Sequence, residues 1–199
     1  MKSITSNLDE TTAKSITYYS ALTHSGDIHC DDVFAAVIID MLYRGNLILY
    51  RVPNIPENVT ENNLIIFGTG KTCFDPESPN APLRGEGKKY SSAGLVWKKH
   101  GRAALRKLDA PGRHIDIIAN NIYKNFIRHI DNRCTGEFNP AFENAFSMKQ
   151  FDDVSRIWTS DEESNEEFCK MFDAAYIIFN QVVQKEIAIW KARANYKKG

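Results

Sequence analysis

The stretch that decides the fold is ITYYSALTHSGDIHCDDVFAAVIIDMLYRGNLILYRV, at positions 16–52. Its first seven residues, 16–22, are rich in β-branched and aromatic side chains and predict a strand. The run at 33–43 is apolar nearly all round and predicts a buried helix, which stops before Gly45. Residues 46–52 predict a second strand. A strand, a buried helix and a second strand in this order are typical of a βαβ unit in a parallel sheet.

The rest of the chain continues this alternation. Residues 64–67 predict a third, fully apolar strand. Helices are expected over 91–108 and 114–131, followed by a weaker segment at 141–158 and a long helix that starts at Asp161. The sequence therefore predicts an α/β fold with a central, mainly parallel sheet of four or five strands flanked by helices. We expect three parts: a polar N-terminal tail at 1–14, an α/β domain at 15–139 and a helical C-terminal portion at 140–199.

The composition excludes several classes of protein. The 199 residues hold 25 Lys and Arg against 25 Asp and Glu, so there is no global basic field to attract nucleic acid. No apolar run is long enough to span a bilayer, and residues 1–14 are polar and lack the apolar stretch of a signal peptide, so we expect none. We therefore expect no membrane partner. The four cysteines are widely spaced, which favours reduced thiols and an intracellular, cytoplasmic protein: Cys30, Cys73, Cys134 and Cys169.

The segment His24-Ser25-Gly26-Asp27-Ile28-His29-Cys30-Asp31-Asp32 carries the strongest chemical signal. It lies between a predicted strand and a buried helix, where open α/β sheets place their sites. Gly26 allows the loop to fold back so that the two imidazoles converge. Imidazole and carboxylate together suit a divalent metal such as Mn²⁺. The alternatives remain open that Asp31 and Asp32 cap the helix and that the histidines are ordinary turn residues.

The segment Gly68-Thr69-Gly70-Lys71-Thr72 is similar to the end of a phosphate-binding P-loop. The full motif requires a glycine where this chain has Ile65, and no helix follows. A glycine turn after a buried strand is the better interpretation. The loop at 68–89 is long for a compact domain, and loops of that length are often functional.

Four segments carry a family resemblance: THSGDIHCDD, FDPES, KYSSAGLVWKKHG and YKNFIRHID. In this order they resemble the metal-dependent hydrolase family typified by the melanocyte-proliferating-gene exonuclease, a branch of the DHH/RecJ-type phosphoesterases. The resemblance covers roughly residues 20–140, with a weaker similarity in 138–140 and the final helix. Members of that family are usually longer, so this chain resembles a shortened, divergent relative.

The resemblance implies metal ligands residue by residue. His24, His29 and Asp31 match the first metal-binding motif, and Asp131 matches the first acid of the fourth. The family's Asp-His-His signature aligns with Asp75-Pro76-Glu77, so the aspartate is kept and both histidines are missing. The family's bridging aspartate is expected near position 67, where this chain has Phe67. Cys134 stands where a second acid is usual.

The family's chemistry is hydrolysis of phosphodiesters or phosphoanhydrides by two metal ions that share a bridging ligand. With those ligands missing, we expect at most one well-held ion, Mn²⁺ or Mg²⁺, with Asp31 and Asp131 in catalytic roles. Three cationic side chains that follow the altered signature could bind substrate phosphate, although a solvated loop is the alternative: Arg84, Lys88 and Lys89.

Two functions therefore compete at this stage. The first is a divergent metal-dependent phosphoesterase, similar to a nuclease, that acts on nucleic acid or a nucleotide. The second is a non-catalytic member of the fold that binds a nucleotide, nucleic acid or protein partner. The sequence does not choose between them, because function depends on the site and the site has lost expected ligands.

Overall fold

The computed structural model describes residues 1–6, 8, 19–55, 59, 64–70, 72, 74–136 and 160–196. Within these residues the sheet has four strands in the order β1-β3-β2-β4, and all neighbours pair in parallel. The predicted α/β fold with a parallel sheet is confirmed. The strands are β1 (Ser3–Thr5), β2 (Ser20–His24), β3 (Ile48–Val52) and β4 (Ile65–Ile66).

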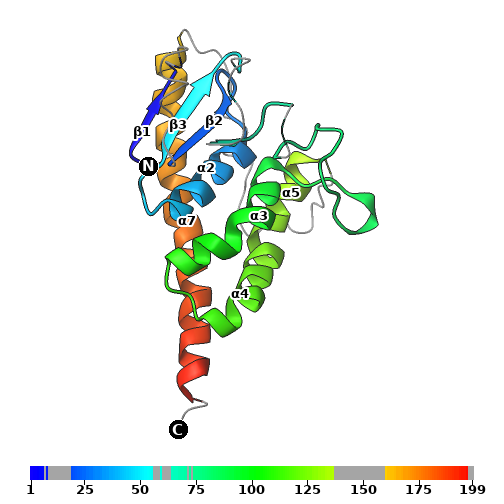
Figure 1. The fold of residues 1–199 in the computed structure, drawn as a ribbon, viewed down its shortest axis with the longest axis vertical. Coiled ribbons are helices and arrows are strands. Elements are labelled where there is room, and N and C mark those ends of the chain that lie inside the picture. The colour runs from blue at the N-terminus through cyan, green and yellow to red at the C-terminus, as the bar shows by residue number, and fades with distance from the viewer. Residues whose placement is uncertain are drawn as a thin grey trace.

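Helices pack against the sheet and one another (Figure 1). α7 (Asp161–Tyr196) is the long C-terminal helix that runs the length of the molecule in Figure 1, so a helical C-terminal segment is confirmed. The other helical elements are α2 (Cys30–Leu42), η1 (Gly85–Gly87), α3 (Ser92–Lys107), η2 (Gly112–His114), α4 (Ile115–Ile122), η3 (Tyr123–Ile127) and α5 (Arg128–Cys134).

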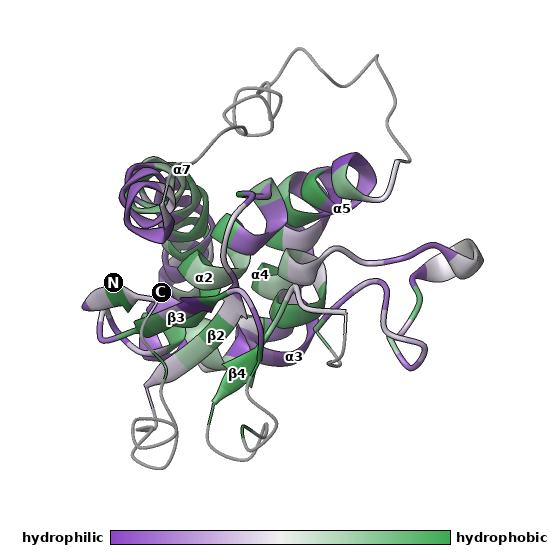
Figure 2. Cartoon of the chain, turned by 90° about the horizontal axis from the view of Figure 1, so that it is seen from above, coloured by the Kyte–Doolittle hydropathy of each residue, from purple (hydrophilic) through white to green (hydrophobic). Residues whose placement is uncertain are grey.

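The core forms around α2, which lies at the centre of the molecule (Figure 2). Every residue of α2 from Cys30 to Met41 is buried, because the helix contacts β2, α3, α5 and α7. This explains why its sequence is apolar on all sides rather than on one face. The opposite face of the sheet carries a smaller apolar cluster of Leu22, Tyr50, Val52, Leu64 and Ile66.

The register of the sheet positions the site. β2 and β3 pair in parallel along their full length, from Ser20 opposite Ile48 to His24 opposite Val52. β4 pairs with β2 at Ala21 and Leu22. The carboxyl ends of all three strands therefore meet at one edge of the sheet, where ligands bind in open α/β folds.

The structure differs from the sequence-based expectation in several local details. The expected N-terminal tail contains a strand, because β1 pairs with β3 and the terminal amine lies 3.1 Å from the Asp40 carboxylate. β2 extends to His24, and residues 16–18 of the expected strand lie outside the described residues. The single helix expected over 114–131 is divided by the π-helical turn η3. The weak segment at 141–158 also lies outside the described residues.

Two further features of the described residues concern membrane-spanning helices and cysteines. Among the described residues, no helix combines the length and the apolar character needed to cross a membrane. Within the part of the chain that the structure describes, Cys30, Cys134 and Cys169 form no disulfide, and Cys73 lies outside it.

Candidate metal centre

A polar hollow of about 410 Å³ lies at the carboxyl edge of the sheet. Three segments surround it: the β2–α2 loop, the segment after β4 and the start of α3. Both histidines of the sequence signal line it, as do several carboxylates. The described lining residues are His24, Ser25, Asp27, His29, Asp31, Asp32, Gly68, Asp75, Pro76, Glu77 and Ser92.

Three side chains converge in this hollow. The Nε2 atom of His24 lies 2.9 Å from Oδ2 of Asp32, and Nδ1 of His29 lies 3.6 Å from the same oxygen. The ligand atoms of His24, His29 and Asp32 all lie within 4.8 Å of one another. Donor atoms bound to one ion at lengths of about 2.0–2.2 Å lie at most about 4.4 Å apart, so the three ligand atoms approach the spacing that one ion requires.

Local sequence explains this convergence. His24 is the last residue of β2, and its Nδ1 atom contacts the Ser25 carbonyl oxygen at 3.0 Å, which orients the ring. Gly26 has a φ of +83°, and this left-handed conformation reverses the chain between the histidines. His29 is the N-cap residue of α2, and Asp32 lies three residues later on the same face of the helix.

The Asp32 carboxylate is held in a tight space but is not fully bonded. Its side chain is only 4% exposed. A Cβ atom added at Gly68, whose φ is +64°, would lie 2.2 Å from Oδ1 of Asp32, so the backbone approaches the carboxylate closely. Oδ1 is buried and has no hydrogen-bond partner among the described residues. A buried, unsatisfied carboxylate oxygen beside two imidazoles fits a divalent cation.

The electrostatics of the cluster follow from its hydrogen bonds. The hydrogen bond with Asp32 raises the pKa of His24 and raises the pKa of His29 to about 9, although burial acts in the opposite direction on both. Burial alone would raise the pKa of Asp32, but the bonds with the two histidines outweigh it and lower that pKa. Without a cation, the protonated imidazoles compensate the buried carboxylate. A cation would have to displace these protons.

Asp31, which the sequence analysis expected as the metal ligand, has a different partner. It lines the hollow, but its Oδ2 accepts a hydrogen bond from the Ser92 backbone N–H at 3.0 Å, at the start of α3. Burial, followed by the nearby Asp32 charge, raises the pKa of Asp31 to about 6. The described structure therefore groups Asp32, not Asp31, with the two histidines. Asp31 and Asp32 both lie in the first turn of α2, where negative charge suits the helix dipole, and the N-cap residue His29 makes no side-chain capping bond.

Asp75 lines the same hollow, but both of its carboxylate oxygens accept hydrogen bonds from its own loop. Its Oδ2 accepts from the Gly70 N–H at 2.5 Å, and its Oδ1 accepts from the Glu77 N–H at 2.7 Å. Pro76 and Glu77 also line the hollow. Both oxygens of Asp75 thus stabilise the turn that presents these two residues.

Asp131 is part of a separate buried cluster. Its Oδ1 accepts from both the N–H and the hydroxyl of Ser91, at 2.9 and 2.7 Å, and its Oδ2 accepts from the Tyr123 hydroxyl at 3.0 Å. Burial raises the pKa of Asp131 despite these bonds. A Cβ atom at Gly94 would lie 2.1 Å from Oδ1. Asp131 does not line the hollow, since the backbone at Ser91 and Ser92 lies between it and Asp31.

The three expected phosphate-binding residues do not line the hollow. Nε of Arg84 donates to the Lys89 carbonyl at 2.6 Å and Nη1 donates to Asn132 at 2.8 Å, so this side chain ties its loop to α5. Lys88 is exposed. The Lys89 ammonium pairs with Glu77 at 2.8 Å and thereby reaches the rim of the hollow.

Comparison with known proteins identifies the family of the chain. A sequence model named for the MYG1 exonuclease, described as "Uncharacterised protein family (UPF0160)", matches residues 20–198. The chain belongs to this family. The MYG1 exonuclease of Mus musculus is 26% identical over 126 residues, which cover 55% of this chain and 33% of the mouse protein. The chain thus spans about a third of the length of that curated relative. No solved structure matches the chain.

The resemblance to the MYG1 exonuclease family is therefore confirmed, and the altered positions acquire a structural meaning. Phe67 is fully buried in the main core, and its backbone N–H donates to Leu22. An aspartate there would bury a charge in an apolar cluster, at a large free-energy cost. Pro76 and Glu77, in contrast, border the hollow and could be exchanged for histidines without entering the core.

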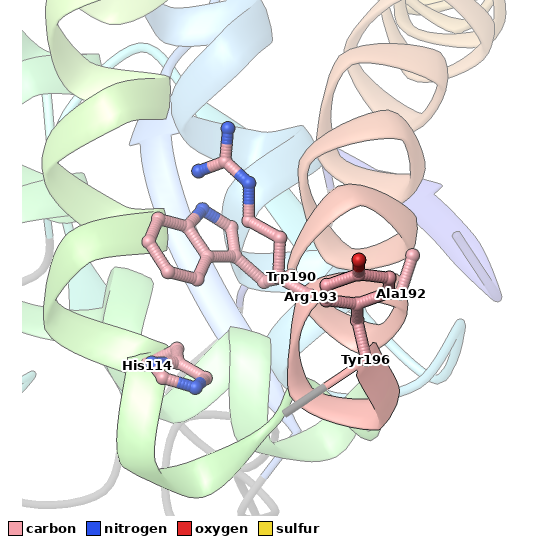
Figure 3. A pocket seen from close by; sticks show the side chains of 5 residues that line it. All are labelled: His114, Trp190, Ala192, Arg193 and Tyr196. Carbon is pink, nitrogen blue, oxygen red and sulfur yellow. The ribbon is translucent and has the colours of Figure 1, made fainter. Parts of the chain in front are cut away.

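A second hollow of about 520 Å³ lies near the C-terminal end of α7 (Figure 3). His114 and Trp190 stack there with ring centroids 4.8 Å apart, and the Arg193 guanidinium lies over the Trp190 ring. Ala192 and Tyr196 complete its described lining. None of these five residues is a carboxylate, so this hollow is not a second candidate for the cation.

Proposed function

We propose that the chain is a divergent metal-dependent phosphoesterase that binds one divalent cation, Mn²⁺ or Mg²⁺, through His24, His29 and Asp32. Its substrate class would be a phosphodiester of a nucleic acid or a nucleotide. The observation that carries the proposal is the convergence of the two imidazoles on Asp32, whose second oxygen is buried and has no partner in the described part of the chain. Membership of a family that contains a protein named an exonuclease supports it.

The residues of the hollow would divide the work among them. When bound, the cation would polarise a phosphoryl oxygen and lower the pKa of a coordinated water. Asp31 faces the same hollow and is held by the Ser92 N–H, so it would accept a proton from the attacking water. Its pKa of about 6 leaves the carboxylate ionised yet basic at neutral pH.

The hydrogen bonds of the other acids support one ion rather than two. Asp75 and Asp131, which the family resemblance implies as ligands, already accept bonds from backbone and side-chain donors. Phe67 offers no bridging carboxylate. Glu77 adds negative charge at the rim, although its ion pair with Lys89 offsets part of that charge for an anionic substrate.

A second candidate, a non-catalytic member of the fold, is favoured by one specific observation. Asp75 and Asp131, which a two-ion site would use, accept protein donors on both oxygens, so such a member would keep the fold and the His24–His29–Asp32 cluster without turnover. It would bind a nucleotide, nucleic acid or protein partner through the same hollow.

The two candidates are separated by a hydrolysis assay with Mn²⁺ on short oligonucleotides and dinucleotides. The phosphoesterase predicts slow wild-type turnover that His29→Ala abolishes. It also predicts that Pro76→His with Glu77→His raises the rate, because both positions border the hollow. Phe67→Asp is left out of this restoration, because position 67 is in the core. If the cation binds but no variant shows turnover, the non-catalytic candidate is favoured. If no cation binds, the metal site is overturned for both candidates.

A further inference from the structure

Arg51 is among the largest fully buried side chains of the protein and lies in β3, next to the loop that joins His24 to His29. It is only 1% exposed, although arginine is rarely buried unless it is paired. No carboxylate among the described residues lies within ion-pairing distance of it. The proposed function gives it no role, so its burial calls for an explanation.

The guanidinium forms a bridge between two separate parts of the chain. On one side, Nη1 donates to Oγ of Ser164 and to Oδ1 of Asn165, each at 3.0 Å, in the first turn of α7. On the other side, Nη2 donates to the carbonyl oxygens of Gly26 and Asp27, at 3.2 and 3.5 Å. These two carbonyls belong to the loop that joins His24 to His29.

Ser164 completes the bridge. Its hydroxyl accepts from Arg51 and donates to the Gly26 carbonyl at 2.7 Å, so that carbonyl is held by two donors. The ring of Phe168, one turn further along α7, lies 4.6 Å from the guanidinium carbon and covers its face. The planar fork of arginine suits this arrangement because it can donate in two directions at once.

The positive charge of Arg51 adds a desolvation cost to its burial. Burial lowers the pKa of Arg51 to about 10, and the Asp32 charge acts in the opposite direction. The group therefore remains cationic at neutral pH, while its hydrogen-bond partners within the described part of the chain are all neutral acceptors. Taking a charge out of water is costly, and hydrogen bonds to neutral acceptors offset that cost only in part.

We propose that Arg51 is a positioning residue of the metal site: it fixes the His24–His29 loop to the first turn of α7, so that α7 sets the placement of both imidazoles. The proposal rests on the proposed function for its effect on the cation. Its effect on the order of the loop does not depend on a cation. Gly26 makes the loop adaptable, and the Arg51 bridge removes that freedom before a cation binds.

The test compares two variants that break the bridge from opposite sides. Arg51→Lys keeps the charge, but its single nitrogen cannot bond to the loop and the helix in the same way. Ser164→Ala with Asn165→Ala removes the acceptors on α7 and keeps Arg51. The control is Asn121→Ala, which removes another side-chain bond to α7, at Glu186, far along the helix from the loop.

Two readouts are measured on the full chain: the Mn²⁺ dissociation constant by calorimetry, and amide hydrogen exchange at residues 25–29 in the cation-free protein. We expect both bridge variants to weaken Mn²⁺ binding about tenfold, as for residues that orient metal ligands. Exchange in the loop should accelerate more than exchange in α2 and β3. Asn121→Ala should leave both readouts within about twofold of wild type.

The outcomes separate this proposal from the proposed function. Wild-type loop exchange and wild-type Mn²⁺ affinity in the double α7 variant would overturn the bridge while leaving the metal site in place. A wild-type protein that binds no Mn²⁺ would overturn the metal site, and loop exchange would then decide the bridge alone. If Arg51→Lys does not fold, the double α7 variant still gives the answer.

Discussion

The Asp32 and Asp131 carboxylates are both almost fully buried, yet their hydrogen bonds differ. Asp131 accepts two bonds from Ser91 and one from Tyr123, so both of its oxygens are satisfied by fixed donors. Asp32 interacts with two histidines through one oxygen, while its other oxygen has no partner among the described residues. Histidine can exchange a proton for a cation, whereas a backbone N–H cannot. The comparison shows that burial alone does not mark a carboxylate as a ligand.

The largest expected effect is on cation affinity, which should depend on Asp32 and not on Asp131. Asp32→Asn keeps the shape of the side chain but removes its charge and one acceptor oxygen, so we expect the Mn²⁺ dissociation constant to rise by about 100-fold or more. Asp131→Asn should leave it within about threefold, because Asp131 does not line the hollow. Calorimetry at pH 7.5 measures both. The comparison fails if Asp131→Asn weakens binding as much as Asp32→Asn does.

The second effect is on stability, where we expect Asp131 to matter more than Asp32. Asp131→Ala leaves the Ser91 N–H and the Tyr123 hydroxyl without their buried acceptor, and we expect the free energy of unfolding to fall by about 2–3 kcal/mol. Urea denaturation in EDTA measures this change. In the same buffer Asp32→Asn should cost less than about 1 kcal/mol, since its histidines can release their protons. Equal losses in the two variants would contradict the distinction.

The third effect uses the two glycines that press against these carboxylates. Gly68→Ala places a Cβ atom on Asp32 and strains a positive φ, so it should destabilise the fold by about 1–2 kcal/mol and weaken Mn²⁺ binding. Gly94→Ala displaces Asp131 and should cost about 1–3 kcal/mol without affecting Mn²⁺.

Gly70→Ala is the matched control for Gly68→Ala, since Gly70 also has a positive φ, of +75°, but no atom of the described residues beyond its chain neighbours lies within 4 Å of an added Cβ. It should show the backbone strain alone, with Mn²⁺ binding unchanged. If Gly70→Ala weakens the cation as much as Gly68→Ala does, the close contact with Asp32 has no role.

The smallest effect concerns pH and the cation-free protein. The folded-state pKa of His29 is raised to about 9, above its ordinary value of about 6.5. The stabilisation from its bond with Asp32 is therefore fully present below pH 6.5 and is lost as the pH rises through 9. We expect the free energy of unfolding in EDTA to fall across this window by less than about 1 kcal/mol, because the His29 ring is largely exposed. His29→Gln should flatten the pH profile, and an unchanged slope would be inconsistent with the pairing.

Local sequence was sufficient for much of the fold. The uniformly apolar run of α2 predicted a central helix, and short apolar strands predicted a parallel sheet, because these patterns reflect burial that holds in any such fold. The predicted helix start at Ser91 is confirmed, since its hydroxyl accepts from the Gly94 N–H. The strand β1 was missed because its three residues, Ser3–Thr5, include one apolar side chain and join the sheet through β3.

The site was predicted less completely. The pairing of His29 with Asp32 had a signal in the sequence: residues three apart share a helix face, whereas His29 and Asp31 do not. No such signal existed for Arg84, whose burial against Asn132 depends on a contact 48 residues away. Arg51 was not singled out, because a single arginine in an apolar strand has no local pattern that reveals its partners.

By itself, the sequence determined the order of elements, the family and the segment that holds the two histidines. These features depend on periodicity, turn residues and short motifs, which are local properties of the chain. Only the tertiary structure decided which carboxylate joins the histidines, which acids are satisfied by other donors, and what holds the loop in place. Those outcomes depend on contacts such as Asp32 with Gly68, Asp131 with Ser91 and Arg51 with Ser164, and a linear pattern does not encode the distances that create them.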